Sequence, residues 1–486
     1  MSEIVNAFQR ASNTKKMLTL VGIYLCTVFS VMQSSGVSMV LPAAATEFDM
    51  LSGTNEAMSI YSLASSLGGP VSVILMPLFG YIAARSPHLK VPIVIGAVLT
   101  GGVVLFVRAI ATNIFVIIVT GALYGVVSAG VFVVGFMLIR DMFEGAKVGV
   151  YMGLIGTMMA IGSLLSPVLT GFVMGAFGWR AACHMLWPFF LVAALCVFLG
   201  VRISKADGEA LANKSGSIDL AGIFAVAIFL APLICGISMG TSFIPFGSVE
   251  SFVTFGIAII AFIALIFIIK KKGDGAVIPL SGLKDRNTVA LALSNFFMNF
   301  ANMFVFFFLP AYIMFVMQPT DLGLEPAAWS GLVMACFAVF GLFLGPIFGR
   351  MIAKSGNARN VIVFGTTCRL LFLLCMILFM TPGFSIFILM GLALVLGGVY
   401  SVMATAYTTG VSVMTPSKLR QQSNAVVQMG QNLGGAPGTA VGGILIATFG
   451  VADGMPIAFI VAAVACVLIY IPTLMLKKPK NYGQEQ

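Results

Sequence analysis

Long apolar segments separated by short polar stretches run along the whole chain. Each is about 20 residues or longer, which is the length a helix needs to cross the hydrocarbon core of a bilayer. Strands of a membrane barrel would instead alternate apolar and polar residues over roughly ten positions. The pattern therefore predicts an all-α polytopic membrane protein of about fourteen helices, near residues 17–42, 55–83, 91–112, 114–138, 147–175, 182–201, 217–240, 250–270, 288–314, 327–350, 360–380, 384–410, 422–446 and 454–476.

Composition and charge support this interpretation. The chain has 486 residues, of which 60% are hydrophobic and 9% charged, whereas a soluble domain averages about 25% charged residues. With the N-terminus inside, Arg108 and Arg180 fall outside, Arg369 falls within a span, and the other 23 of the 26 Lys and Arg residues lie inside. This asymmetry follows the positive-inside rule. The net charge of +10 therefore reflects membrane topology, and no nucleic-acid partner is expected.

The sequence contains no pattern typical of a catalytic or metal centre. The 8 cysteines are scattered without metal-ligand spacing, and there are only 2 histidines. We therefore predict no enzyme activity, no metal and no cofactor. The first apolar run, from Met17 to Leu41, is too long for the core of a signal peptide and is interpreted as the first span.

Two sets of residues recur at nearly constant offsets. Pro77–Ser86 reads PLFGYIAARS and Pro346–Ser355 reads PIFGRMIAKS, an offset of 269 residues. At an offset of 272, three glycines match three later ones, namely Gly162, Gly171 and Gly178 with Gly434, Gly443 and Gly450. We predict two homologous six-helix bundles, residues 1–210 and 276–486, with an inserted two-helix segment at 211–275. Such parallel repeats place a binding site between the halves near the membrane midplane.

With these motifs the chain resembles the major facilitator superfamily, and within it the fourteen-helix drug:proton antiporter branch. The family's loop after helix 2 reads Gly-x-Leu-Ala-Asp-Arg-x-Gly-Arg-Arg, and this chain has Gly80 to Lys90 there and Gly349 to Arg359 in the repeat. The antiporter motif of helix 5 is matched in spacing, with Ser-Pro in place of Gly-Pro: Gly153, Gly162, Ser166, Pro167 and Gly171. Asp219-Leu-Ala-Gly222, which opens span 7, and Pro279-Leu before span 9 also resemble that branch.

The sequence departs from the family at positions that the resemblance links to gating and proton coupling. Ala84 and Ala353 replace the acidic residue of the loop motif, and Gln33 stands where helix 1 usually carries Asp. The helix 4 motif Arg-x-x-Gln-Gly reads Gly121-Ala-Leu-Tyr124-Gly125, without its Arg.

Candidate coupling or gating residues come from the motifs and from ionisable groups in spans, which are costly in lipid. Arg369 in span 11 is such a group, although it could instead anchor helix ends or snorkel. Glu56 in the first turn of span 2 is a candidate proton site, or an acid that favours the helix N-terminus. For Arg108, Arg180 and His184, near the outer boundary, we expect snorkelling or interface roles. The full candidate set is Glu56, Arg85, Gly162, Pro167, Gly171, Lys354 and Arg369.

Candidate substrate-binding residues are polar side chains on spans that face the cavity in the family. In span 9, Asn295, Asn299 and Asn302 share one helix face at i, i+4 and i+7. Such amide stripes could line a cavity or simply join helices. The candidate set is Gln33, Tyr61, Ser65, Tyr124, Asn295, Asn299, Asn302, Tyr400, Tyr407 and Gln428.

The expected function is export of small amphipathic or drug-like organic molecules by alternating access, with proton antiport. A facilitator or symporter without the usual coupling residues is an alternative, and a non-transporting sensor or scaffold is another. The expected partners are a small organic substrate, protons and the lipid bilayer. The expected state is a monomer in the plasma membrane, the inner or cytoplasmic membrane of a prokaryote.

Overall fold

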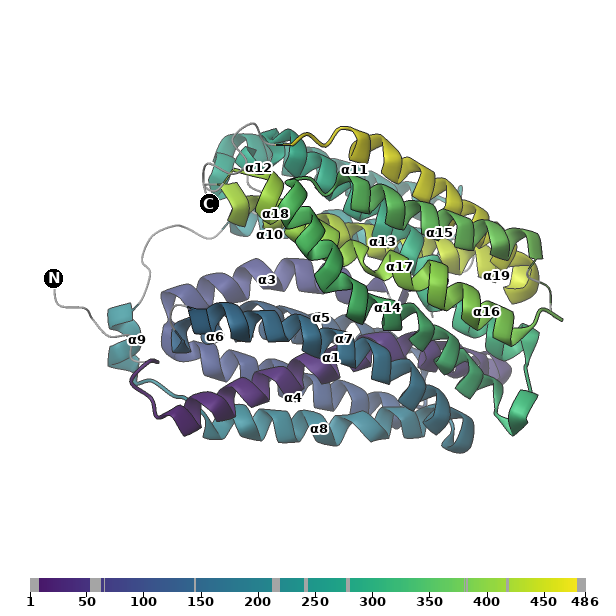
Figure 1. Cartoon of the computed structure of the whole chain (residues 1–486), viewed down its shortest axis with the longest axis horizontal. Helices are drawn as coiled ribbons and strands as arrows, with labels where there is room; N and C mark the ends of the chain where they lie inside the picture. Colours follow the sequence, from purple (N-terminus) through teal and green to yellow (C-terminus); the bar gives the residue numbers. More distant parts are fainter. Residues whose placement is uncertain are drawn as a thin grey trace.

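The computed structural model of the chain is an all-helical bundle, and it describes residues 8–52, 63–64, 66–143, 146–211, 219–239, 244–276, 280–379, 381, 383–416 and 419–478. No strand occurs in these ranges. Two groups of long helices lie beside one another, the first from purple to blue and the second from green to yellow in Figure 1. This arrangement matches the all-α class predicted from hydropathy.

The first group is the N-terminal half. Asn113 begins α5 as an N-cap, because its side chain accepts a hydrogen bond from the Phe115 amide at 2.8 Å. The described helices of this half are α1 (Asn13–Ser52), α3 (Gly68–Arg85), α4 (Lys90–Ala109), α5 (Ile114–Ala129), α6 (Phe136–Met142), α7 (Ala146–Phe177) and α8 (Trp179–Leu199). A π-helical turn, Gly130–Gly135, joins α5 to α6. The short helix α9 (Lys205–Leu211) follows.

An inserted pair, α10 (Leu220–Ser238) and α11 (Val249–Lys272), separates the two halves in sequence. Asp219 is the N-cap of α10, with its Oδ1 accepting from the Gly222 amide at 2.8 Å. The same oxygen pairs with Lys272 Nζ at the end of α11, also at 2.8 Å. Buried apolar residues of α10 and α11 form one cluster with Val73 of the first half and Ala436 of the second. The inserted pair therefore packs against both halves.

The second group is the C-terminal half. Its helices are α12 (Leu280–Lys284), α13 (Arg286–Tyr312), α14 (Pro326–Ser355), α15 (Arg359–Phe379), α16 (Ile386–Leu392), α17 (Gly398–Ser401), α18 (Met403–Met414) and α19 (Arg420–Leu474). A π-helical turn, Ala393–Gly397, joins α16 to α17. The sequence predicts one continuous helix for span 12, residues 384–410, but in the structure this span is interrupted. Gly397 and Gly398 lie at this irregularity, packed against the rings of Phe337 and Phe340.

The helices account for the predicted number of spans. Twelve segments of the described chain are long and apolar enough to cross a membrane, and the last of them runs from Val426 to Leu474. That segment contains a break at Gly450, where φ is 76° and ψ 172°, so it supplies two crossings. The interrupted helices α16 to α18 supply one more. Helix α1 also continues to Ser52, beyond the predicted end of span 1 at residue 42.

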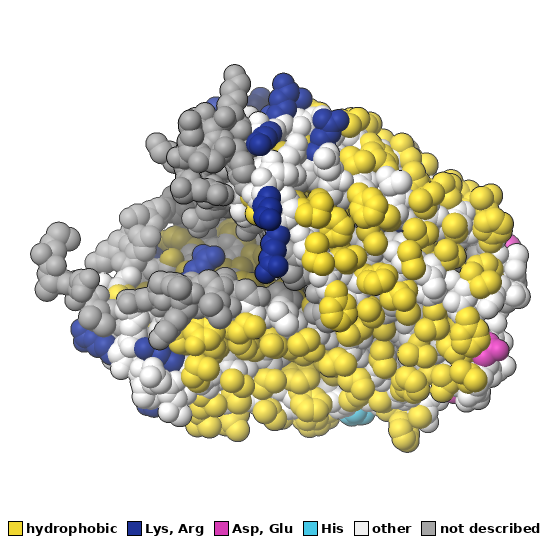
Figure 2. All heavy atoms as spheres, in the orientation of Figure 1, with side chains coloured by type: hydrophobic (Ala, Val, Ile, Leu, Met, Phe, Trp, Pro, Cys, Tyr) yellow, Lys and Arg dark blue, Asp and Glu magenta, His cyan; other side chains and the backbone are white. Residues whose placement is uncertain are grey.

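The outer surface of the bundle is that of a membrane protein. Large apolar side chains are exposed along both halves and the inserted pair, among them Val103, Phe224, Phe267 and Leu378. Figure 2 shows hydrophobic side chains over most of one face, while Lys and Arg gather at one end. We call this end the basic end; α1 begins and α19 ends there (Figure 1). The opposite end, where α7 ends and α14 begins, is called the far end.

Candidate functional site

The small-residue motif of α7 allows its backbone to approach α1 closely. A Cβ atom on Gly162 would lie 2.7 Å from the Val28 carbonyl oxygen, so only glycine fits this contact. Ser166, which replaces the motif's glycine, donates a hydrogen bond from Oγ to the Met32 carbonyl at 2.5 Å. The substitution therefore keeps the small size and adds a bond between α7 and α1.

The corresponding glycine of the second half makes the corresponding contact. A Cβ atom on Gly434 of α19 would lie 2.1 Å from the Phe296 carbonyl oxygen of α13. Gly162 and Gly434 were matched in sequence, and each faces the first long helix of its own half. The repeat therefore preserves a packing geometry as well as a residue type.

The two halves meet at the far end through α7 and α14. A Cβ atom on Gly171 would lie 2.6 Å from the Ala327 carbonyl oxygen, and one on Gly331 would lie 2.2 Å from the Pro167 carbonyl oxygen. At the basic end the surface between the halves is hollowed (Figure 2). Gly171 and Pro167, both predicted as coupling or gating residues, thus lie at the contact between halves.

A polar cluster joins three segments of the first half at the far end. Arg180 Nη1 bonds to Glu47 Oε1 at 2.7 Å and Oε2 at 2.6 Å, and Trp179 Nε1 donates to Glu47 Oε2 at 2.6 Å. Arg180 Nη2 also donates to the Ala111 carbonyl at 3.0 Å. The hydrogen bond from Arg180 lowers the pKa of Glu47. Arg180 therefore connects α8 to α1 and to the segment between α4 and α5, which fits the expected interface role.

Arg108 differs from the expectation of snorkelling. It is 1% exposed, and its Nε donates to Thr120 Oγ1 at 3.2 Å. It lines a cavity of about 10 Å³ with Gln33 and Thr170, enclosed by α1, α4, α7 and α8. The expectation was wrong because nearness to a helix end does not determine side-chain direction, and here the guanidinium turns into the bundle. Burial of Arg108 is the feature of the site that the sequence missed.

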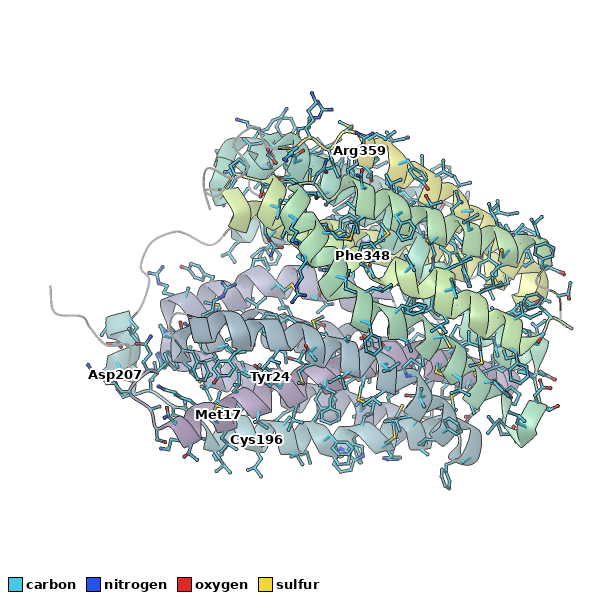
Figure 3. The ribbon with its side chains drawn as sticks, viewed as in Figure 1. Met17, Tyr24, Cys196, Asp207, Phe348 and Arg359 are labelled. Atoms are coloured by element: carbon cyan, nitrogen blue, oxygen red, sulfur yellow. The ribbon has the colours of Figure 1, made fainter. Side chains whose placement is uncertain are left out.

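Gln33 is one of the predicted binding residues, and it lies in this cavity. Its side chain is 1% exposed, and neither Oε1 nor Nε2 has a hydrogen-bond partner. Tyr124 lies nearby in the same half and donates its hydroxyl to the Ser30 carbonyl of α1 at 2.6 Å. Tyr24 of α1 (labelled in Figure 3) makes a similar hydrogen bond between helices. Its hydroxyl donates to the Tyr151 carbonyl of α7 at 2.8 Å.

The amide stripe of α13 divides into two parts. Asn295 Nδ2 donates to the Val427 carbonyl of α19 at 3.0 Å, and Asn299 Nδ2 donates to Asn295 Oδ1, also at 3.0 Å. Both side chains are buried. Asn295 joins α13 to α19, whereas the bond from Asn299 to Asn295 lies within α13. Asn302 is half-buried and its Oδ1 accepts from Arg369 Nη2 at 3.1 Å.

Arg369 lies in the core of the second half. Its side chain is 0% exposed, which excludes snorkelling in this structure. The guanidinium carbon lies 5.6 Å from the ring centroids of both Phe337 and Phe372, within the range of cation–π attraction. Arg369 therefore links α13, α14 and α15.

The other predicted residues lie apart from these clusters. Arg85 donates to the Tyr81 hydroxyl at 2.7 Å at the exposed end of α3, and Lys354 is exposed at the end of α14. Tyr407 is buried and Gln428 is half-buried. Glu56, Tyr61, Ser65 and the side chain of Tyr400 lie outside the described residues.

A larger groove lies on the outer surface of the first half, and Thr120, the partner of Arg108, is among its lining residues. It has a volume of about 680 Å³ and is lined almost entirely by apolar residues of α4 and α5, including Val103, Phe115 and Val119. These side chains are exposed on the outer surface. In the described part of the chain no group of three or more His, Cys, Asp or Glu side chains could hold a metal ion.

Two related helical halves, an inserted pair and an apolar outer surface define a polytopic helical membrane protein built on a repeat. A family model described as Major Facilitator Superfamily matches residues 23–318 and 291–486. The chain belongs to the major facilitator superfamily.

The relatives of this chain include named transporters. Multidrug transporter protein MdtP of Bacillus subtilis (strain 168) is 20% identical over 359 residues, which cover 73% of this chain and 61% of that protein. Efflux pump dotC of Dothistroma septosporum is 26% identical over 363 residues, which cover 73% of this chain and 58% of that protein. The matched region thus spans about three fifths of the length of each relative.

Solved structures share the fold. A peptide transporter POT crystallised with sulfate aligns with a TM-score of 0.60 at 14% identity, covering 94% of this chain and 96% of that one. A bacterial homolog of the human lysosomal transporter Spinster, in an inward-facing and occupied conformation, aligns with a TM-score of 0.62 at 12% identity, covering 96% and 97%. At these identities the likeness concerns the fold alone.

Proposed function

We propose that this protein exports small amphipathic or drug-like organic molecules across the cytoplasmic membrane by alternating access. It acts as a monomer of the fourteen-helix drug:proton antiporter branch, and proton antiport drives the export. The observation that carries the proposal is the contact of α7 with α14 at the far end, at Pro167, Gly171 and Gly331, together with the hollow between the halves at the basic end (Figure 2).

This geometry supports alternating access for a mechanical reason. The far-end contact is made by backbone atoms facing glycines, so it can form and separate without rearranging long side chains. Rocking one half against the other would open the far end and close the basic end around a site between them. The multidrug and efflux names of the relatives support drug-like molecules as the substrate class.

The solute binds between the halves in this proposal. Tyr124 and Gln428 are half-buried, as a residue that meets a transient solute requires. Asn295 supports the site indirectly, because its hydrogen bond holds α13 against α19, and Asn299 donates in turn to Asn295. Tyr61, Ser65 and Tyr400 remain predicted contributors.

Proton coupling is assigned to Glu56. Among the described carboxylates, Glu47, Asp141 and Asp219 pair with basic residues, and Gln33 replaces the acid of helix 1. Glu56 therefore remains the predicted proton-binding residue of the spans. The alternative is a facilitator or symporter that uses no protein carboxylate, and the buried, uncharged Gln33 is the observation that favours it.

Uptake of candidate drugs into inverted membrane vesicles tests this proposal. With an imposed proton gradient, we expect wild-type vesicles to accumulate substrate and Glu56→Gln vesicles to bind but not concentrate it. Glu209→Gln, at an exposed position of α9, is the matched control and should behave as wild type. Accumulation that ignores the gradient for every substrate tested would rule out antiport and leave the facilitator.

A further inference from the structure

The small cavity inside the first half collects polar atoms that have no partner. Gln33 Oε1 and Nε2, Arg108 Nη1 and Thr170 Oγ1 are all buried without a hydrogen bond. All three residues line the same cavity. Buried polar groups are nearly always paired, so four unpaired atoms around one cavity indicate a site for a polar species, either water or a ligand.

The positive charge of Arg108 indicates which kind of ligand the cavity would bind. Thr120 uses its own hydroxyl proton to bond the Ile117 carbonyl at 2.9 Å, so it only accepts from Arg108. Among the described residues no carboxylate pairs with Arg108. A water could accept hydrogen bonds from the guanidinium, but it would leave the buried charge uncompensated.

The available groups around the cavity also suit an anion. Arg108 Nη1 and the Thr170 hydroxyl both donate, and the Gln33 amide can present its NH₂ by turning about its last bond. Three donors that converge without an acidic residue form a favourable environment for negative charge.

We infer that Arg108, Gln33 and Thr170 form a binding site for one small monovalent anion. The cavity of about 10 Å³ has room for about one water-sized sphere. A halide such as chloride is somewhat larger than a water molecule and fits after a small outward shift of the lining side chains. A single carboxylate group fits if α1 and α7 separate slightly. The site lies within the first half, and its occupation does not depend on the proposed export function.

The first experiment measures the thermal stability of the purified full-length protein in detergent, without any gradient. Sodium chloride is titrated against sodium isethionate, whose sulfonate is too large for the cavity, at constant ionic strength. We expect a saturable rise of Tm with chloride in the wild type and none in Arg108→Gln.

Two further variants keep the test valid if Arg108→Gln does not fold. Thr170→Val preserves shape and removes one donor to the anion, so the half-saturating chloride concentration should rise about tenfold. Thr100→Val makes the same change at a half-buried position of α4, beside the outer groove and outside the polar cavity, and should leave the chloride response unchanged. Equal chloride responses in the wild type and in Thr170→Val would overturn the inference.

A second arm identifies the source of the anion. Benzoate and acetate replace chloride in the same titration. Saturation by chloride alone identifies a free halide, whereas a larger response to the carboxylates, again lost in Thr170→Val, identifies the carboxylate of an organic solute. If neither chloride nor any carboxylate raises the wild-type Tm above the isethionate reference, the site does not bind anions. The titration reports anion binding and requires no transport. A protein that binds the anion but does not export drug-like molecules would therefore support this inference and contradict the proposed function.

Discussion

Gly178 and Gly450, which are 272 residues apart, adopt the same unusual backbone conformation. Gly178 has φ 81° and ψ 170°, and Gly450 has φ 76° and ψ 172°. This region of φ and ψ is essentially restricted to glycine. Each residue breaks the chain between the last two spans of its half, so the sequence repeat reproduces a turn that only glycine can make.

Replacing Gly450 with Ala should therefore destabilise the protein by about 1–3 kcal/mol. The cause is backbone strain alone, because a Cβ atom at this position has nothing within 4 Å. Gly256→Ala is the matched control: Gly256 is equally open but lies in the regular helix α11. Thermal unfolding in detergent should show a lower Tm for Gly450→Ala and no loss for Gly256→Ala. Equal values for the two variants would contradict the strain.

Gly331→Ala should separate the two halves at the far end, where α14 contacts α7. Its Cβ would lie 2.2 Å from the Pro167 carbonyl oxygen, a distance that forces α14 away from α7. Spin labels at Thr112, in the loop between α4 and α5, and at the exposed Asp453, just after the break at Gly450 in α19, should show a longer mean distance than in the wild type. Gly349→Ala on the same helix meets its nearest atom at an ordinary 3.4 Å and should leave the distance unchanged. An unchanged distance in Gly331→Ala would mean that this contact does not hold the halves together.

The Glu47–Arg180 pair should make stability depend on acid pH. The bond from Arg180 lowers the pKa of Glu47 from 4.5, so the stabilisation is present above about pH 4.5 and lost as the pH falls through the lowered value. Both side chains are more than a third exposed, so solvent screening limits the contribution to about 0.5 kcal/mol. Glu47→Gln should lower Tm at pH 7 relative to wild type, and the difference should shrink near pH 3. Glu209→Gln should follow the wild type; a constant difference for Glu47→Gln would contradict the linkage.

Removing Asn302, a hydrogen-bond partner of Arg369, should lower the stability of the protein. Asn302→Ala deletes an acceptor from a buried guanidinium, a loss of about 1.5–3 kcal/mol for a hydrogen bond to a charged group. Asn424→Ala changes an exposed amide of α19 and should cost less than about 0.5 kcal/mol. The two variants are compared by thermal unfolding, and equal effects would show that the Asn302 bond contributes nothing to stability.

The repeat was the most predictable part of the fold. Hydropathy located the spans, and the glycines matched by the 272-residue offset are those at which the structure repeats a break, at Gly178 and Gly450, and a close contact, at Gly162 and Gly434. These features follow from local constraints, namely helix length and the absence of a side chain. Such constraints can be recognised in sequence without knowing which helices are neighbours.

Side-chain partners were much less predictable. Asn295, Asn299 and Asn302 share a face by periodicity, yet each has a different kind of partner: Asn295 bonds to α19, Asn299 bonds to Asn295, and Asn302 bonds to Arg369. Arg108 was expected to snorkel or to lie at the interface near the outer boundary, and it is buried in the first half. Which neighbour a polar group meets depends on how helices rotate against each other, and periodicity carries no information about that rotation.

Substrate counterflow in proteoliposomes tests the central claim, transport by alternating access, most directly. Vesicles containing the purified protein are loaded with an unlabelled organic ligand identified by thermal shift, and entry of the labelled ligand is followed without any gradient. We predict a transient accumulation of label above equilibrium in the wild type, which Gly331→Ala reduces and Gly349→Ala does not. Entry no faster than in protein-free vesicles, for every ligand that the protein binds, would contradict the account.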